Sequence, residues 1–250
     1  MNWTLLKYFI KKNWALWLGF LAFLMMEMIV CILMVDTIPE MMDGMLGIES
    51  GASMLDFVAN LLPIYCSMFV MAYCIFIIFR TLYKPIDSTS LSSHLAAGTS
   101  RKKYIVTAAV FLAASVFAMF VVMFALCGVI MVVTKGSIDW LAWLNLNFSF
   151  FVNIIMVAFI CFFFASCFAP GNIAKIGMVG LPILFLLFQL FASFDIAIFK
   201  IISPFSWLDA TAIAAGTFTL WWLWNLIFIA ISVAVFTATL YIFKRKQLSI

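Results

Sequence analysis

The sequence predicts an all-α membrane protein in which residues 1–250 form a single transmembrane domain with six transmembrane helices. Of the 250 residues, 68% are hydrophobic and only 10% are charged, and the mean hydropathy is +1.24. Soluble domains carry about 25% charged residues, so this chain lacks the polar groups that cover a water-facing surface. The composition therefore excludes a soluble globular domain, a secreted disulfide scaffold, a coiled coil and a disordered chain.

The lengths of the apolar runs give the second observation. A helix needs about 20 apolar residues to cross the ~30 Å hydrocarbon layer, and six runs meet this requirement. The runs are continuously apolar rather than alternating, which favours helices over a barrel. Tryptophans near their ends are typical of an interfacial belt. The predicted spans cover residues 16–35, 58–79, 104–133, 144–168, 176–194 and 221–243.

The first twelve residues predict a short amphipathic helix that lies in the membrane interface. Trp3, Leu6 and Ile10 recur at helical spacing, whereas Lys7 and Lys11 are basic. A basic amphipathic segment before a span is typical of a helix that lies on the membrane surface. It acts either as a topology anchor or as part of a surface that holds a soluble partner.

The distribution of Lys and Arg predicts a multi-pass protein of the cell membrane with both termini in the cytoplasm. Twelve of the 14 basic residues fall on one side of the predicted spans, and only Lys135 and Lys200 fall on the other. Basic residues favour the cytoplasmic side of a span. A seventh span over residues 197–216 would place Lys200 and Asp209 in lipid and the basic tail outside, so we exclude it.

The loop between the second and third predicted spans indicates an element presented to the cytoplasm. Residues 80–104 are rich in Ser and Thr and carry five Lys or Arg residues. Asp87 or Ser88 is placed to cap a short helix that runs through Leu91 and ends at Gly98. We expect this helix to lie parallel to the membrane as a docking element. The alternative is an ordinary basic loop that only sets topology.

The last outer loop, residues 194–218, is neither fully apolar nor fully polar. Pro204 interrupts it, and Asp209 is placed to cap a helix through Ala215 that Gly216 ends. Such a segment can dip into the outer half of the membrane where it packs against protein. It forms either a lid above a central path or an interfacial helix without a gating role. The candidate outer-gate residues are Ser203, Pro204, Phe205 and Asp209.

Three polar residues within the predicted spans are candidates for a transport pathway or a subunit interface, namely Glu27, Asn153 and Gln189. An ionised carboxylate near the bilayer centre costs about 2.5–3.5 kcal/mol, so Glu27 should face a cavity or a partner helix, or be protonated. The pathway and structural interpretations of Glu27 both stay open. Interhelical amide hydrogen bonds contribute only about 0.6 kcal/mol on average, and a structural role is favoured for Asn153 and Gln189.

No motif indicates catalysis or a metal site on this chain. It contains no GxxxxGK[ST] for ATP phosphates, no HExxH and no CxxC pair. His94 is the sole histidine, and the six cysteines lie in apolar runs, where free thiols behave as small hydrophobes. We therefore expect no enzyme, no catalytic residue, no metal and no cofactor here, and any ATPase on another chain.

Three stretches, in this order along the chain, resemble the membrane subunit of an ABC-2-type exporter. They are residues 1–12, residues 92–108 (SSHLAAGTSRKKYIVTA) and residues 202–209 (ISPFSWLD). The family has six helices with both termini inside, an amphipathic first helix, a cytoplasmic coupling helix between spans 2 and 3, and re-entrant outer helices between spans 5 and 6. The resemblance implies ATPase-coupling residues at Lys84, Pro85, Ile86, Asp87, Ser88, Leu91, Ser92, Ser93, His94 and Arg101.

The same resemblance implies the partners of the chain. Two permease subunits, identical or different, pair in the lipid bilayer, and each docks an ABC ATPase subunit that holds ATP and Mg; no nucleic acid takes part. The small size and the 16 Met and 29 Phe residues resemble Gram-positive exporters of amphipathic peptides, such as phenol-soluble modulins. Two other functions stay open: an integral-membrane enzyme (an intramembrane protease or a lipid-modifying enzyme) and a non-transporting immunity or regulatory membrane protein.

Overall fold

The computed structural model describes residues 1–34, 54–88, 91, 99–192 and 196–245, and every regular element in these ranges is helical. Within these described ranges, six helical segments are long and apolar enough to cross a membrane, in agreement with the predicted number. The chain therefore has the architecture of a multi-pass membrane protein. The long helices are α1 (Trp3–Met34), α3 (Met54–Ile78), α6 (Arg101–Lys135), α7 (Trp140–Phe168), α9 (Leu181–Ala192) and α12 (Trp221–Arg245).

Two of the six spans contain a π-helical turn. The second span continues from α3 through η1 and α4 as far as Asp87, beyond its predicted end at residue 79. The fifth span, Asn172–Ala192, is built from α8, η2 and α9. A continuous helix satisfies its own backbone in an apolar layer, and both π turns keep the chain helical. The short elements are η1 (Phe79–Tyr83), α4 (Lys84–Asp87), α8 (Asn172–Lys175) and η2 (Ile176–Gly180).

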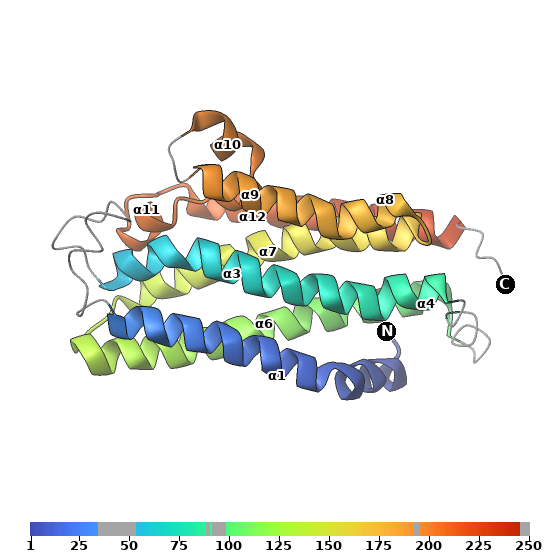
Figure 1. Cartoon of the computed structure of the whole chain (residues 1–250), viewed down its shortest axis with the longest axis horizontal. Helices are drawn as coiled ribbons and strands as arrows, with labels where there is room; N and C mark the ends of the chain where they lie inside the picture. Colours follow the sequence, from blue (N-terminus) through green and yellow to red (C-terminus); the bar gives the residue numbers. More distant parts are fainter. Residues whose placement is uncertain (35–53, 89–90, 92–98, 193–195, 246–250) are drawn as a thin grey trace.

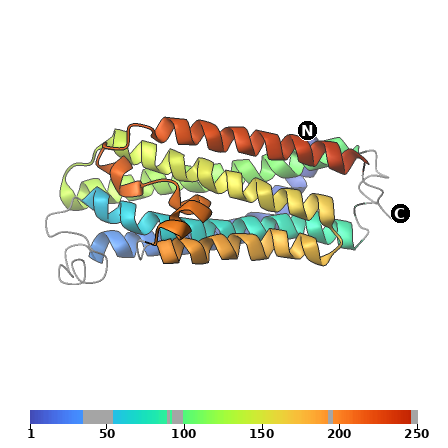
Figure 2. The same cartoon turned by 90° about the horizontal axis from the view of Figure 1, so that it is seen from above.

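The six spans lie side by side along the long axis of the molecule, with α7 in the interior (Figure 1). α7 packs against α3, α6 and α12, while α1 packs against α3 and α6. In the orthogonal view, α9 and α12 lie on opposite sides of the bundle (Figure 2). α7 is the most deeply buried span, whereas α1, α9 and α12 expose rows of large apolar side chains. The outer faces of these three helices have the character of lipid-facing surfaces.

The N-terminal segment differs from the prediction of a separate interfacial helix. Residues Trp3–Met34 form one continuous helix of 32 residues. Its first turn is capped by Asn2, whose Oδ1 accepts the backbone N–H of Thr4 (3.1 Å) and of Leu5 (3.3 Å). No Pro or Gly lies between Lys12 and the apolar run that follows, so nothing in the sequence breaks the helix there. The amphipathic segment is therefore the first part of α1.

Polar caps place the starts of α6 and α7 a few residues before their apolar runs. The Ser100 hydroxyl accepts the backbone N–H of Lys103 (3.3 Å) at the start of α6. Asp139 Oδ1 accepts the N–H groups of Leu141 (2.9 Å) and Ala142 (3.1 Å) at the start of α7. A capping side chain satisfies N–H groups that have no partner within the helix. Hydropathy alone therefore predicts both starts too late.

Between α9 and α12 the described chain forms three short helical elements and no seventh span, as predicted. We call residues 196–216 the outer segment; it packs against α3, α7 and α9. Asp209 Oδ1 accepts the N–H of Ala212 (3.0 Å), and Gly216, with φ of +70°, follows the last short helix. α9 stops short of the end of the bundle that α3 reaches, and the outer segment follows it there (Figure 1). Its elements are α10 (Ala197–Ile202), η3 (Pro204–Ser206) and α11 (Ala210–Ala214).

Of the 13 described basic residues, 11 lie at one end of the bundle, whereas Lys135 and Lys200 lie toward the other end. α1 begins and α12 ends at the first end, and α4 and α8 lie there as well (Figure 1). Lys200 of α10 and the capping residues Asp139 and Asp209 belong to the elements near the opposite end. We call the first the basic end and the second the outer end. The basic end carries Lys7, Lys11, Lys12, Arg80, Lys84, Arg101, Lys102, Lys103, Lys175, Lys244 and Arg245.

The bundle is tight where η2 meets α7, and a glycine substitution there tests this packing. A methyl group added at Gly177 would overlap the Cβ and ring atoms of Phe164, and overpacking of this kind costs about 1–3 kcal/mol. We expect Gly177→Ala to lower the Tm of the purified protein in detergent. Gly19→Ala is the matched control, because no atom lies within 4 Å of the added carbon. Equal Tm values for the two variants would contradict the close contact of η2 with α7.

Candidate functional site

Two hydrogen bonds fasten the outer segment to the interior of the bundle. Asn153 of α7 donates from Nδ2 to the carbonyl oxygen of Pro204 (2.9 Å). Ser203 donates from its hydroxyl to the carbonyl oxygen of Phe185 in α9 (2.8 Å). Asn153, Ser203, Pro204 and Phe205 are all buried. The structure thus brings one predicted pathway residue, Asn153, together with three of the four predicted outer-gate residues.

The outer segment extends from the outer end of the bundle toward the middle of the spans. Asn153 follows the start of α7 by 13 residues, which corresponds to about 20 Å along the helix axis at 1.5 Å per residue. Phe185 precedes the end of α9 by seven residues, or about 10 Å. The Ser-Pro-Phe turn therefore lies beside the middle of α7, and it is deeply packed although it connects two spans.

Aromatic packing holds the same segment against α12. The Trp207 ring stacks on Phe228 with a centroid distance of 6.0 Å and lies 5.9 Å from the Trp224 ring. Its indole N–H donates to the carbonyl oxygen of Ile201 (2.7 Å), which closes the turn on itself. Asp209 differs from its buried neighbours because it is exposed and caps α11. Its position suits a structural cap at the rim of the segment.

Two further polar contacts join spans in the interior, and the sequence analysis did not identify them as pairs. Ser67 of α3 donates to Oε1 of Gln189 in α9 (2.9 Å). Asn225 of α12 donates from Nδ2 to the hydroxyl of Ser149 in α7 (2.9 Å). Ser149 lies one helical turn before Asn153, so α7 presents polar groups at two successive turns. The sequence shows these side chains as single polar residues within apolar runs, but no local feature of the sequence indicates which of them form pairs.

Glu27 lies elsewhere, where α1 contacts α3. It is half-buried, and it interacts electrostatically with Cys31 of its own helix and Tyr65 of α3. These three side chains form a small polar group on α1 and α3, whereas the Asn153 contact lies on α7. The structure therefore does not bring Glu27 together with Asn153. Gln189, the third predicted pathway residue, contacts α3 through Ser67.

At the basic end, the π turn η1 is fixed from two sides. The Tyr104 hydroxyl of α6 donates to the carbonyl oxygen of Thr81 (2.7 Å), and both residues are buried. Tyr83 stacks on Phe79 (5.5 Å between ring centroids), and Lys175 of α8 places its Nζ 6.0 Å from the Tyr83 ring centroid. These contacts connect the end of the second span at the basic end with both α6 and α8.

The predicted coupling residues divide into exposed and buried groups. Lys84, Asp87 and Ser88 are exposed, and the Ser88 hydroxyl donates to the carbonyl oxygen of Lys84 (2.7 Å). Pro85, Ile86 and Leu91 are buried, and Arg101 is half-buried at the start of α6. Asp87 is the last residue of α4 and Ser88 follows it as C-cap. Ser92, Ser93 and His94, with most of the helix predicted to run to Gly98, lie outside the described residues.

Removing the hydrogen bond between Asn153 of α7 and Pro204 tests whether this bond holds the outer segment in place. Asn153→Leu removes one of the two hydrogen bonds that the Pro204 carbonyl accepts and leaves the backbone N–H of Trp207 (3.3 Å) as its donor, so we expect a cost of about 0.5–1.5 kcal/mol. We expect backbone amides of residues 203–216 to exchange with deuterium roughly tenfold faster. Asn147→Leu is the matched control, because Asn147 donates only within α7, to the Trp143 carbonyl (2.8 Å). Unchanged exchange in Asn153→Leu would show that the outer segment is held by other contacts.

Neutral hydrogen-bonding groups hold the outer segment to the bundle. Among the described residues, its buried polar groups are hydroxyls and amides, and no group of three or more His, Cys, Asp or Glu side chains is placed to hold a metal ion. No disulfide joins any of the six cysteines, all of which lie within the described residues. Comparisons with family models, with curated proteins and with solved structures find no match for this chain.

Proposed function

We propose that this chain is the membrane-spanning permease subunit of an ATP-driven exporter of the ABC-2 type. It pairs with a second permease in the cell membrane, with both termini in the cytoplasm, and each permease docks a separate ATPase subunit that binds ATP and Mg. The cargo is an amphipathic or hydrophobic molecule moved out of the cell, and amphipathic peptides are the class to test first. The chain itself carries out no catalysis in this proposal.

One observation carries the proposal. A single helical unit, α3 followed by η1 and α4, runs from the outer segment to the exposed Lys84, Asp87 and Ser88 at the basic end. Near the outer end it packs against α11, and Ser67 bonds Gln189 of α9. A helix moves along its axis as a rigid body, so a displacement of α4 would also displace the end of α3 that contacts the outer segment.

The contacts of η1 provide a route by which the same displacement reaches other spans. Tyr104 holds the Thr81 carbonyl, and Phe9 of α1 packs edge-on against the Tyr104 ring (6.0 Å between centroids). A partner that moved α4 would therefore bias α6 and α1 along with α3. An exporter needs two discrete packings whose balance a nucleotide-driven partner can shift, and the contacts of η1 with α6 are the place where movement of α4 would change the packing of the spans.

The outer segment supplies the other requirement of a transport path, a barrier that can be opened. The two hydrogen bonds from Asn153 and Ser203 are few and neutral, and each contributes about 1 kcal/mol. A barrier held by contacts of this size is within the range that ATP-driven movement of α3 can overcome. This supports an outer-gate function for Ser203, Pro204 and Phe205.

Assembly with an ATPase is the first test. We expect a GxxxxGK[ST]-containing ATPase encoded beside this chain to co-purify with it in mild detergent. Replacing Ser92, Ser93 and His94 together by Ala should lower that recovery at least fivefold, because these polar residues belong to the proposed docking element. Thr219→Ala, an exposed change in the segment before α12, is the control and should leave recovery unchanged.

Four results would contradict this assignment. One is repeated purification of a lone monomer without an ATPase, and another is equal ATPase recovery from the triple variant and the unchanged chain. The third is turnover of a lipid or of a peptide bond by the purified chain without ATP, which would favour a membrane enzyme. Protection of cells from a toxin without any ATPase partner would favour an immunity protein.

Glu27 gives a second test of the transport path. If its carboxylate contacts the cargo, Glu27→Gln removes a charge at nearly constant size and should lower cargo-stimulated ATP hydrolysis of the reconstituted complex at least threefold. Met26→Leu, at an exposed neighbouring position, is the control. Assembly with the ATPase should be intact in both variants. Unchanged stimulation in Glu27→Gln would place the residue outside the path.

A further inference from the structure

Two cations from different helices meet on the side of the bundle, where α1 packs against α3. The Arg80 guanidinium of η1 donates from Nη2 to the backbone carbonyl oxygen of Lys12 in α1 (3.4 Å). Lys12 is exposed and Arg80 is half-buried, so both charges can be reached from outside the bundle. We call Lys12 and Arg80 the cation pair. Like charges that are held near each other repel, and an anion between them removes this repulsion.

No acidic side chain of the described chain neutralises the cation pair. Lys12 Nζ donates to the Tyr8 hydroxyl (3.2 Å) and lies 5.3 Å from the Tyr8 ring centroid. The Arg80 side chain makes no contact with another described residue besides the hydrogen bond to Lys12. Asp87, the next described acid along the second span, lies about 10 Å beyond Arg80. A guanidinium has five N–H donors in a planar fork, so Arg80 keeps donors for anionic oxygens.

The depth of the cation pair matches the boundary between the hydrocarbon layer and the lipid headgroups. Along the helix axes, Lys12 lies about 33 Å from Met34 of α1, and Arg80 lies about 33 Å from Val58 of α3. The hydrocarbon layer is about 30 Å thick. Because the sequence predicts the outer boundary next to Met34 and Val58, both cations lie at the level of the headgroups at the basic end.

An apolar surface continues from the cation pair toward the middle of the spans. Phe76 lies one turn before Arg80 and is 51% exposed, and its ring centroid lies 5.8 Å from that of Phe20 in α1. In the other direction the two spans continue to Trp3 and Asp87. The pair is therefore a charged point above an apolar surface, away from the tip of the bundle. This arrangement fits a molecule with an anionic head and an apolar chain, more than a soluble partner that docks at the tip.

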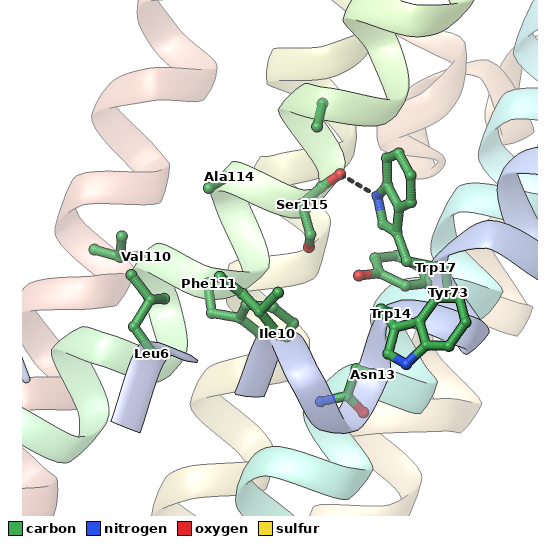
Figure 3. A pocket seen from close by; sticks show the side chains of 11 residues that line it. Leu6, Ile10, Asn13, Trp14, Trp17, Tyr73, Val110, Phe111, Ala114 and Ser115 are labelled. Carbon is green, nitrogen blue, oxygen red and sulfur yellow. Dashed lines mark hydrogen bonds between the residues drawn. The ribbon is translucent and has the colours of Figure 1, made fainter. Parts of the chain in front are cut away.

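Contacts with α6 fix the place of α1 beside α3. The Trp17 indole N–H donates to the backbone carbonyl oxygen of Ser115 in α6 (2.9 Å; Figure 3). Near the start of the helix, the backbone N–H of Asn2 donates to the Thr107 hydroxyl (2.9 Å). Lys12 lies between these two points of the chain, so its backbone stays in place. A preformed site loses less conformational entropy on binding than one that must be created.

We propose that the cation pair binds the phosphate of an anionic phospholipid in the leaflet at the basic end. The Arg80 guanidinium donates to the phosphate oxygens, Lys12 adds a second positive charge, and an acyl chain lies against Phe76 and Phe20. Basic residues between spans are typical of sites for anionic headgroups. A zwitterionic lipid carries an amine that offsets its phosphate, so the pair favours lipids with a net negative charge. The site does not depend on the exporter proposal.

Native mass spectrometry of the full-length protein, released from detergent, tests this site. The protein is first incubated with an equimolar mixture of phosphatidylglycerol and phosphatidylcholine that have identical acyl chains. We expect phosphatidylglycerol to remain bound at least fivefold more than phosphatidylcholine. An excess of inorganic phosphate should not displace it, because the acyl chain contributes to binding. This comparison needs no variant, so it does not depend on how a substitution affects folding.

Variants then assign the binding to the cation pair. Arg80→Gln and Lys12→Gln each remove one accessible charge and should lower the retention of phosphatidylglycerol at least threefold. Arg245→Gln is the matched control and should leave retention unchanged. The Arg245 guanidinium lies 4.2 Å from the Tyr241 ring centroid, at the same sequence spacing as Lys12 and Tyr8, but no contact within the described chain joins it to a cation of another helix.

Four results would overturn the proposal. Equal retention of the two lipids would show that negative charge is not selected. An equal loss in Arg245→Gln and Arg80→Gln would show a diffuse attraction to the whole basic end instead of a site. Displacement by inorganic phosphate would assign the pair to a free anion. Unchanged retention in both Arg80→Gln and Lys12→Gln would place the bound lipid elsewhere.

Discussion

The hydrocarbon layer of a membrane neither donates nor accepts hydrogen bonds, so each polar group that a span carries into it needs a partner within the protein. This constraint explains why all described regular elements are helices and why π turns, not breaks, interrupt the second and fifth spans. It also explains the pairing of isolated interior residues. Ser67 meets Gln189, Ser149 meets Asn225, and Asn153 meets a backbone carbonyl.

The same constraint shapes the outer segment. The Pro204 carbonyl accepts the backbone N–H of Trp207 within its own turn and also the side-chain amide of Asn153 from α7. The segment thereby becomes part of the packed interior, at mid-depth along α7. Because its hydrogen bonds are few and neutral, it is both well placed and separable. That combination distinguishes a movable barrier from a core that stays fixed, and it underlies the proposed gate.

The two ends of the bundle differ in what they offer to partners. The basic end presents the exposed residues of α4 beside the anchored π turn η1, and the outer end is filled by the outer segment. α3 joins the two, which makes a mechanical link between them physically reasonable. The cation pair of Lys12 and Arg80 lies on the side of the bundle, where α1 meets α3.

Hydropathy and charge, read from the sequence alone, determined the six spans and the accumulation of basic residues at one end, because both depend on local composition. Turn chemistry determined the Asp209 cap and the interruption at Pro204. α6 and α7 begin earlier than hydropathy predicts because capping side chains lie before their apolar runs. The amphipathic segment is continuous with the rest of α1 because no helix-breaking residue separates them. Only tertiary structure decided which polar residues pair. Asn153 and Pro204 are 51 residues apart and Ser67 and Gln189 are 122 apart, so no local pattern relates them. Tertiary structure likewise brought Arg80 to the backbone of Lys12, because the two belong to different helices whose packing is set by their neighbours.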